Sequence, residues 1–307
     1  MKSFIRALTP PFIYNAAHAM RRFGKPNETD DSRPIDPNIM ANVHGVSLRI
    51  PRSHNLPVYV AQHPHYDTAM PNIVKHMRNT LGRPITVIDV GANIGDTAKL
   101  SASLVQKDDV HFICVEACRE FFDLLRENTD GLNVEVVHTI AGAETKMMDV
   151  SVNSSGAGTA VILKGDQSKV TTLDDIAAGR AIDLIKIDTD GFELEVIKGA
   201  RQTILRNRPA IYFEFAPRNI RFYGSASPYQ LLADLLELGY ANVLSYDNLG
   251  NMIGRYPING EVMIALSQYA EARTSFYLDL LVMADGPSFD QLSESEIERT
   301  KAPPLFG

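Results

Sequence analysis

The sequence has few cysteines and no long apolar run. Cys114 and Cys118, the two cysteines, lie close together in an apolar stretch, which excludes a small disulfide-stapled fold and indicates buried thiols in a reducing compartment. No apolar run is long enough to span a bilayer. The N-terminus also lacks the apolar core and small-residue cleavage site of a secretory signal. We therefore expect a soluble, cytoplasmic protein.

An excess of positive charge is also absent. The 307 residues carry a formal net charge of −7, which argues against a general nucleic-acid binder, because such surfaces need clustered Lys and Arg. Hydrophobic residues make up 45% of the chain, enough for one large core and too many for global disorder.

The N-terminal segment departs from this acidic balance. Residues 1–27 contain five Lys or Arg and no acid, and residues 1–24 show the spacing of an amphipathic helix. One interpretation is a helix that contacts an anionic membrane surface, at the inner membrane face, and brings the protein to a lipid-linked glycan. The other is a helix that packs on the domain or on a second subunit. We favour the first and leave the oligomeric state open.

Three further segments follow from composition and periodicity. Residues 25–38 are polar and rich in proline, which predicts a linker after the basic segment. Residues 39–84 are hard to assign and are interpreted as a substrate or lid region. There, His63, His65 or Tyr66 is a candidate lining residue for an acceptor pocket, although an ordinary surface loop is the favoured interpretation. Residues 269–307 are expected to be a C-terminal extension, with a polar surface tail from residue 285.

From residue 85 to 268 the pattern predicts one α/β domain. Apolar runs alternate with helical segments, which indicates a doubly wound, parallel sheet. The run after residue 240 is joined to the next by turn residues without a helix, so this last pair is expected to be antiparallel. The predicted strands are Ile85–Val90, Val110–Val115, Val134–Ile140, Asp183–Asp188, Ala210–Phe215, Ala241–Tyr246 and Glu261–Leu266.

A glycine-containing turn, DVGANIGD, follows the first predicted strand. Ligands bind doubly wound sheets at the carboxyl ends of strands, where glycines let the backbone turn tightly. A dinucleotide fingerprint would place glycines at Asn93 and Asp96, and no phosphate-binding P-loop is present. S-adenosylmethionine (SAM) carries no phosphate and a positive sulfonium, which suits the carboxylates of Asp89 and Asp96.

Carboxylates at three further strand ends are candidate site residues. Glu116 lies where an acid meets ribose hydroxyls in such folds, the alternative being a solvated acid at the next helix. Asp188 shares a strand face with Lys186, since the two are two residues apart. Glu214 lies inside an apolar run, which is costly unless it is paired, with Lys186 or Arg218, or belongs to a site.

The motifs VIDVGANIGDTA, VTTLDDI and DLIKIDTDGFELEVIKGA, with Glu116 between the first two, resemble the FkbM-type family of SAM-dependent methyltransferases. The resemblance covers about residues 85–216. It implies a class I methyltransferase (Rossmann-like) fold of seven strands, the last antiparallel, and O-methylation of sugars or other hydroxylated biosynthetic products. Asp190 stands where the family often has Glu. The resemblance implies cofactor contacts at Asp89, Gly91, Asn93, Gly95 and Glu116. Asp96 and Ala141 are further predicted cofactor contacts.

We therefore expect an O-methyltransferase that acts on a saccharide or glycan-type hydroxyl, in polysaccharide biosynthesis. Asp188 is the candidate base or acceptor-orienting group, with Glu214 as the second candidate. No metal is expected; a Mg²⁺ ion on Asp188 and Glu214 is the less favoured alternative. The alternative functions are a non-catalytic SAM-binding scaffold, which the acids after the fourth strand disfavour, and a nucleotide-dependent oxidoreductase, which Asn93 and Asp96 disfavour.

Overall fold

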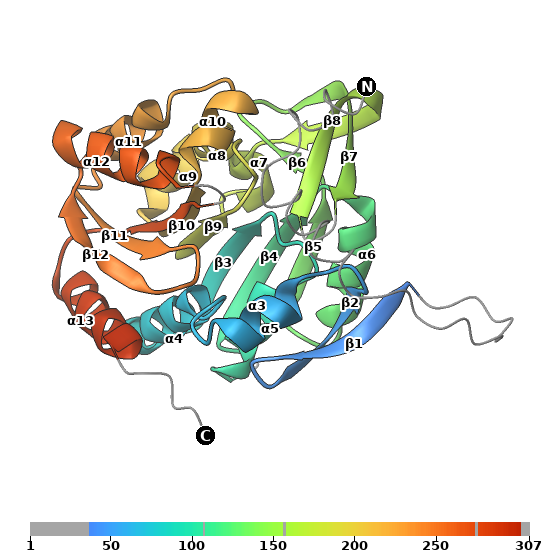
Figure 1. The fold of residues 1–307 in the computed structure, drawn as a ribbon, viewed down its shortest axis with the longest axis horizontal. Coiled ribbons are helices and arrows are strands. Elements are labelled where there is room, and N and C mark those ends of the chain that lie inside the picture. The colour runs from blue at the N-terminus through green and yellow to red at the C-terminus, as the bar shows by residue number, and fades with distance from the viewer. Residues whose placement is uncertain (1–36, 107, 156–157, 274–275, 302–307) are drawn as a thin grey trace, which may run out of the picture.

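The computed structural model describes residues 37–106, 108–155, 158–273 and 276–301. The amphipathic segment expected at residues 1–24, and nearly all of the expected linker, lie outside the described residues. Figure 1 shows a central sheet with helices on both of its faces. Among the described residues, no helix is long and apolar enough to cross a membrane.

The main sheet has eight strands in the order β12-β11-β13-β10-β9-β3-β4-β5. The five strands from β10 to β5 run parallel, and β13 lies antiparallel between β10 and β11. This order confirms the class I methyltransferase fold, with β12 as an additional strand at one edge. The bounds are β3 (Ile85–Val90), β4 (Val110–Glu116), β5 (Val134–His138), β9 (Leu184–Ile187), β10 (Ala210–Phe215), β11 (Asn242–Asp247), β12 (Met252–Pro257) and β13 (Leu278–Val282).

The predicted strands from Ile85 to Tyr246 are confirmed to within two residues, but the one at Glu261–Leu266 is wrong. That segment belongs to α12 (Gly260–Glu271). The Asn259 side chain caps the helix by accepting a hydrogen bond of 3.0 Å from the Val262 N–H. The residues that α12 buries recur at helical spacing, and they are Met263, Leu266, Ser267 and Ala270.

The C-terminal part of the chain completes the sheet rather than extending from it. β13 lies beyond residue 268, where we expected the domain to end. Helix α13 (Pro287–Lys301) buries Phe289 and Leu292 and packs against α4 (Ala69–Leu81) and β12. The expectation of a polar surface tail from residue 285 is therefore wrong for residues 287–301, because their apolar side chains cover one face of the sheet.

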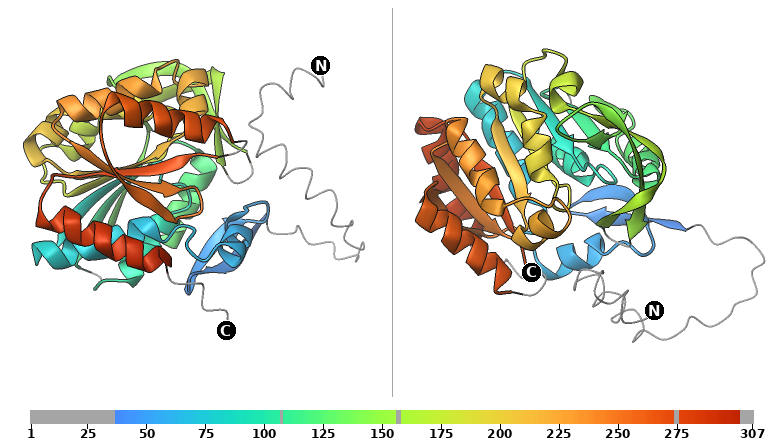
Figure 2. Two further views of the ribbon diagram at one scale, coloured as in Figure 1. Left: turned by 60° about the vertical axis from the view of Figure 1, so that its left-hand side comes forward. Right: turned by 90° about the horizontal axis from the view of Figure 1, so that it is seen from above.

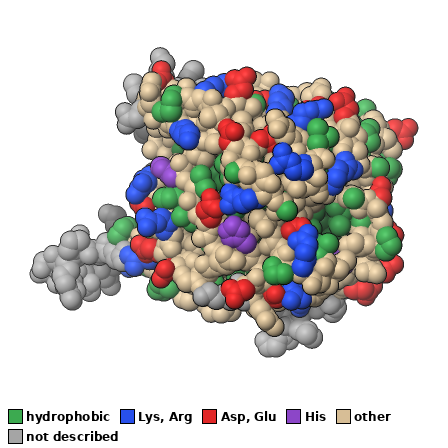
Figure 3. All heavy atoms as spheres, turned by 180° about the vertical axis from the view of Figure 1, so that it is seen from behind, with side chains coloured by type: hydrophobic (Ala, Val, Ile, Leu, Met, Phe, Trp, Pro, Cys, Tyr) green, Lys and Arg blue, Asp and Glu red, His purple; other side chains and the backbone are tan. Residues whose placement is uncertain are grey.

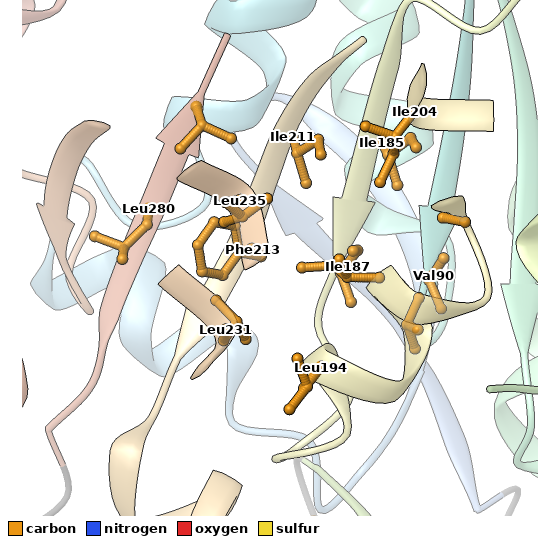
Figure 4. Close-up of a cluster of buried hydrophobic side chains, with 14 of the residues drawn as sticks. Val90, Ile185, Ile187, Leu194, Ile204, Ile211, Phe213, Leu231, Leu235 and Leu280 are labelled. Atoms are coloured by element: carbon orange, nitrogen blue, oxygen red, sulfur yellow. The ribbon is translucent and has the colours of Figure 1, made fainter. Parts of the chain in front are cut away.

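Helices cover the two faces of the sheet in separate groups (Figure 2). One face carries α4, α5 (Asp96–Ser103), α6 (Arg119–Asn128) and α13. The other carries α7 (Leu173–Ala177), α8 (Glu193–Lys198), α9 (Arg201–Asn207), α10 (Pro217–Phe222), α11 (Pro228–Glu237) and α12. Figure 4 shows this second interface, where Ile187 and Phe213 of the sheet face Leu194 and Leu231 of the helices.

Residues 38–62, which the sequence left unassigned, form a hairpin and a helix. The hairpin consists of β1 (Asn38–Val43) and β2 (Val46–Pro51), and α3 (Leu56–Gln62) follows it. Their buried apolar side chains form one cluster with those of α5 and α6. A separate three-stranded sheet consists of β6 (Ile140–Ala141), β7 (Lys146–Ser155) and β8 (Gly158–Thr171).

Candidate active site

A cavity of about 260 Å³ lies at the carboxyl ends of β3, β9 and β10. Its floor is formed by the turn after β3 and by the residues that follow β9 and β10. One wall comes from the start of α3 and from Tyr66 and Asp67, and another from residues that follow α12. The cavity therefore lies where ligands bind doubly wound sheets.

The turn after β3 is pressed directly against the end of β9. Gly91 has a φ of +75°, and a Cβ built on it would lie 1.8 Å from the Asp188 carbonyl oxygen. Both the left-handed backbone and the contact therefore require glycine. Gly91, Asn93 and Asp96 line the cavity, whereas Gly95 is buried beside Leu125 on α6.

Lys186 joins the acids of the first and fourth parallel strands. Its Nζ lies 3.1 Å from Asp89 Oδ1 and 3.5 Å from Asp188 Oδ2. Burial lowers the pKa of Lys186, but the charges of Asp89 and Asp188 raise it by more, so the amine stays protonated. Asp89 is fully buried, so it supports the floor of the cavity rather than lining it.

Asp188 is the candidate base, and the structure places it in the cavity with its side chain 46% exposed. The contact with Lys186 confirms that the two side chains share one face. Asp96 and Asp67 line the same cavity as Asp188. Burial raises the pKa of Asp96, which Lys186 opposes, and burial with the charge of Asp96 raises the pKa of Asp67 well above its usual range.

Glu214 lines the same cavity but has neither of the partners considered from sequence. Lys186 binds Asp89 and Asp188, and Arg218 donates to the Glu271 carbonyl oxygen instead. Glu214 is 8% exposed, and its Oε1 is buried without a hydrogen-bond partner among the described residues. Burial, followed by the charges of Asp188 and Asp190, raises its pKa well above the usual range. Burial therefore favours the protonated form of Glu214, which offers a hydrogen bond rather than a basic oxygen.

Asp279 was missed by the sequence reasoning. It lies on β13 directly opposite Glu214, so the two carboxyl groups occupy the same face of the sheet. Burial, followed by the charge of Asp188, raises the pKa of Asp279 to about 8. The signal was an acid inside the apolar run LDLLV, the same signal that indicated Glu214.

Besides Asp89 and Gly95, two further predicted cofactor contacts, Glu116 and Ala141, do not line the cavity in this structure. Glu116 is 2% exposed, and its carboxylate accepts hydrogen bonds from the N–H groups of Asn93 (2.8 Å) and Cys118 (2.7 Å). Burial raises the pKa of Glu116 to about 7, while these N–H groups oppose the shift. Ala141 is also buried, on β6. Their roles toward a cofactor stay predictions.

The aromatic wall was only partly anticipated. Tyr66 lines the cavity, whereas His63 and His65 do not. The ring of Tyr66 is stacked on that of Tyr59, with the centroids 5.1 Å apart and an interplanar angle of 17°. In the part of the chain that the structure describes, no group of three or more His, Cys, Asp or Glu side chains is arranged to hold a metal ion.

Residues 89–241 match the family model for the methyltransferase FkbM domain. The domain belongs to the FkbM-type methyltransferases. The match begins at Asp89, near the end of β3, and ends just before β11. It thus contains the whole floor of the cavity, whereas the two walls lie largely outside it.

The solved structures that the chain matches include three methyltransferases of low sequence identity. A methyltransferase FkbM from Methylobacillus flagellatus KT is 22% identical, with a TM-score of 0.39 over 52% of this chain and 39% of that chain. A SAM-dependent methyltransferase from Agrobacterium tumefaciens is 11% identical, with a TM-score of 0.44 over 83% and 72%. The plantazolicin methyltransferase BpumL, in complex with SAH, is 12% identical, with a TM-score of 0.39 over 74% and 88%.

The chain thus spans about two fifths of the length of the M. flagellatus protein. No match was found among the curated proteins.

Proposed function

We propose that the FkbM-type domain transfers a methyl group from SAM to a hydroxyl oxygen of a saccharide. The observation that carries this proposal is one cavity that combines the glycine turn after β3 with Asp188 and Glu214, at the ends of β9 and β10. In this arrangement the turn would bind the cofactor and the two carboxyl groups would handle the proton of the acceptor around the same space. The family match supports methyl transfer, and the choice of a saccharide oxygen is the finer part of the proposal.

The residues at the strand ends fit SAM by their charge. The carboxylates of Asp96, Asp188 and Asp190 line the cavity and suit the positive sulfonium and ammonium groups. Gly91 and Asn93 would approach the cofactor with their backbone. Glu116 would hold the ribose hydroxyls, because each of its oxygens has lone-pair capacity beyond the backbone N–H that it accepts. When bound, SAM supplies the electrophilic methyl group.

Asp188 and Glu214 take different roles on the acceptor. Asp188 is the more exposed of the two and has a carboxylate oxygen 3.5 Å from the Lys186 amine, so it is the group that takes the proton of the acceptor hydroxyl. Protonated Glu214 donates a hydrogen bond that orients the acceptor. A positioned base of this kind accelerates a reaction by about 10²–10⁴.

The first experiment is isothermal titration of the full chain with SAM, SAH and NAD. We expect micromolar binding of SAM and SAH and none of NAD. In Glu116→Gln the affinity for SAM should fall about tenfold or more, because a charge-assisted hydrogen bond is weakened. Exposed Glu120→Gln on α6 is the control and should leave it unchanged. Binding of NAD alone would favour the oxidoreductase, and SAM binding without turnover on any acceptor would favour the scaffold.

The role of Asp188 is tested by Asp188→Asn. We expect turnover to fall by about 10²–10⁴ while the affinity for SAM changes little, as measured by SAH formation and by titration. Glu195→Gln, in the same sequence motif but paired with Lys198 on the surface, should keep full turnover. Full turnover by Asp188→Asn would contradict the assignment.

Chelation tests the magnesium alternative. Activity should survive exhaustive treatment with EDTA, because two oxygen-donor side chains are few for an ion that prefers six oxygen ligands. Loss of activity that Mg²⁺ restores would instead assign the two carboxyl groups to a metal.

A further inference from the structure

Two arginines line the cavity on the side away from the turn after β3. Arg218 lies in α10, and Arg273 follows the end of α12 by two residues. Both side chains are exposed, and both face the space that Asp188 and Glu214 also line. Arg218 lies within the FkbM-type family match, whereas Arg273 lies beyond its end, so the family match assigns no role to Arg273.

Both guanidinium groups are held by carbonyl oxygens at the end of α12. Arg218 Nη2 donates to the Glu271 carbonyl, and Arg273 Nη1 donates to the Tyr269 carbonyl at 2.8 Å. The Arg273 guanidinium also lies over two rings, 3.6 Å from the Tyr269 centroid and 5.5 Å from that of Phe276. These contacts hold each arginine in position. Because a guanidinium has five N–H donors, each arginine keeps most of its donors for another partner.

The positive charge of these two groups is not neutralised. Carbonyl oxygens carry no net charge, and the nearby carboxylate of Glu271 is taken by Arg221 in an ion pair. In the described part of the chain, neither Arg218 nor Arg273 forms an ion pair with a carboxylate. The wall formed by α10 and the residues after α12 therefore presents two positive charges to the cavity.

The rest of the cavity has the opposite character. Its floor carries the carboxyl groups of Asp96, Asp188, Asp190 and Glu214. The stacked rings of Tyr59 and Tyr66 line it together with Phe276 and Tyr277. The cavity thus combines an acidic floor, which suits a cationic cofactor, with aromatic surface and a guanidinium pair, which suit a ring that carries an anion.

We propose that Arg218 and Arg273 form an anion subsite for the acceptor, and that the acceptor is a saccharide bearing a carboxylate or a phosphate group. This inference rests on the proposed methyl transfer and names its substrate class. Two planar guanidinium forks match the oxygens of a carboxylate or a phosphate in bidentate geometry. The aromatic side chains then pack against the sugar ring, and the hydroxyl to be methylated faces Asp188.

The structural alternative is that the two arginines only stabilise the C-terminal end of α12, where cations are favourable. That role predicts a loss of stability and no change in the recognition of an acceptor. The experiment therefore compares the Michaelis constant with the unfolding midpoint. Arg201→Gln is the control, because Arg201 is exposed on α9 and does not line the cavity.

The test uses matched neutral and anionic acceptors with the full-length protein. Each pair consists of the methyl glycoside of glucose, galactose or mannose and the methyl glycoside of the corresponding uronic acid, and its two members differ only at C6. The hexose 6-phosphates form a third arm. Formation of SAH reports turnover, and titration of the SAH-loaded protein reports binding. We expect at least one anionic acceptor to have a KM at least tenfold below that of its neutral partner. The uronide and phosphate arms show which anion is preferred.

Arginine variants then connect this preference to the subsite. Arg218→Gln and Arg273→Gln should raise the KM for the anionic acceptor at least tenfold and leave the neutral acceptor, kcat and the affinity for SAM within about twofold. Arg273→Lys should keep the unfolding midpoint and still raise KM, because an ammonium lacks the planar fork. Arg201→Gln should leave KM unchanged.

Each other outcome has a defined meaning. Equal use of neutral and anionic acceptors, or arginine variants that change only the unfolding midpoint, would overturn the anion subsite. Arginine variants that weaken SAM binding instead would assign the pair to the cofactor's own carboxylate and also overturn it. If SAH binds but the loaded protein neither binds nor methylates any anionic acceptor, the substrate class is wrong. If the protein binds neither SAM nor SAH, the proposed function itself fails.

Discussion

The carboxyl groups of Glu214 and Asp279 occupy directly opposed positions on β10 and β13. Burial raises the pKa values of both groups, and the charge of Asp188 adds to each shift. Lys186, the cation that could relieve them, is held between Asp89 and Asp188. At the scale of single residues, the site therefore surrounds Asp188 with acids whose protonated form is favoured by burial.

Asp279 should make the stability of the protein fall as the pH rises. Its pKa is about 8 in the folded chain, against 3.8 for an unperturbed Asp. Between these values the unfolded chain has lost a proton that the folded chain keeps. The contribution of Asp279 to the free energy of unfolding is therefore greatest below pH 3.8 and falls until about pH 8. This single group can contribute up to about 1.4 kcal/mol per pH unit.

In Asp279→Asn this slope should be reduced, so that the variant gains stability relative to the wild type between pH 4.5 and 7.5. Urea unfolding at several pH values measures the difference. The exposed Asp130→Asn is the control and should follow the wild type. A stability difference that does not change with pH would refute the shifted pKa.

Gly91→Ala should cost more than the same change at another left-handed glycine. Gly45 has a φ of +88° and open space around it, so Gly45→Ala should cost only about 1–2 kcal/mol for the backbone conformation. At Gly91 the new methyl also meets the Asp188 carbonyl, and we expect at least about 2 kcal/mol more in urea unfolding, with loss of SAM binding. Equal costs at the two positions would show that the turn after β3 can move away from β9.

At the scale of elements, α13 fastens the loop that carries Tyr66 and Asp67. Arg299 donates to Thr68 Oγ1 at 2.7 Å and to the Gly250 carbonyl at 3.1 Å, and it is paired with Glu296 at 2.7 Å. These bonds join the last described helix to the loop before α4 and to the turn between β11 and β12. A helix that we expected to be a surface tail thus supports one wall of the cavity.

Arg299→Ala should destabilise the protein by about 3 kcal/mol, because it leaves the Glu296 carboxylate, 1% exposed, without its cation. Adding Glu296→Gln should recover part of this loss. Lys301→Ala is the control on the same helix; its partner is the exposed Glu298, and we expect a change below about 0.5 kcal/mol. Chemical denaturation measures all three, and a cost for Arg299→Ala as small as that of Lys301→Ala would exclude the fastening role.

At the scale of the whole molecule, charge is mixed rather than gathered. Figure 3 shows Lys and Arg side chains interspersed with Asp and Glu on the face opposite to that of Figure 1. With a net charge of −7, this surface offers no broad basic patch on that face. The basic character lies in residues 1–27, which precede the described part of the chain.

We therefore expect any binding to anionic membranes to depend on that segment. The full chain should sediment with vesicles that contain phosphatidylserine, and a shortened chain starting at Pro37 should not. Raising the salt concentration should release the full chain, since the attraction is electrostatic. Equal sedimentation of the two chains would mean that residues 1–36 are not a membrane anchor.

Local pattern was enough to predict the parallel strands and the place of the site. Runs such as ITVIDV and DLIKID are β-branched, apolar and followed by glycine, so each identifies a buried strand and its end without knowledge of the rest of the chain. Because all parallel strands end at one edge, Gly91, Asp188 and Glu214 were expected to lie together, and they line one cavity.

Tertiary structure decided which charges meet and which segments close the cavity. Lys186 pairs with Asp89 rather than Glu214, because β9 lies beside β3 with these two residues in register. Asp279 reaches Glu214 only because β13 inserts between β10 and β11. Arg273 and Tyr66 meet at the cavity from distant parts of the chain. Such contacts depend on strand order and on long-range burial, for which no local sequence pattern exists.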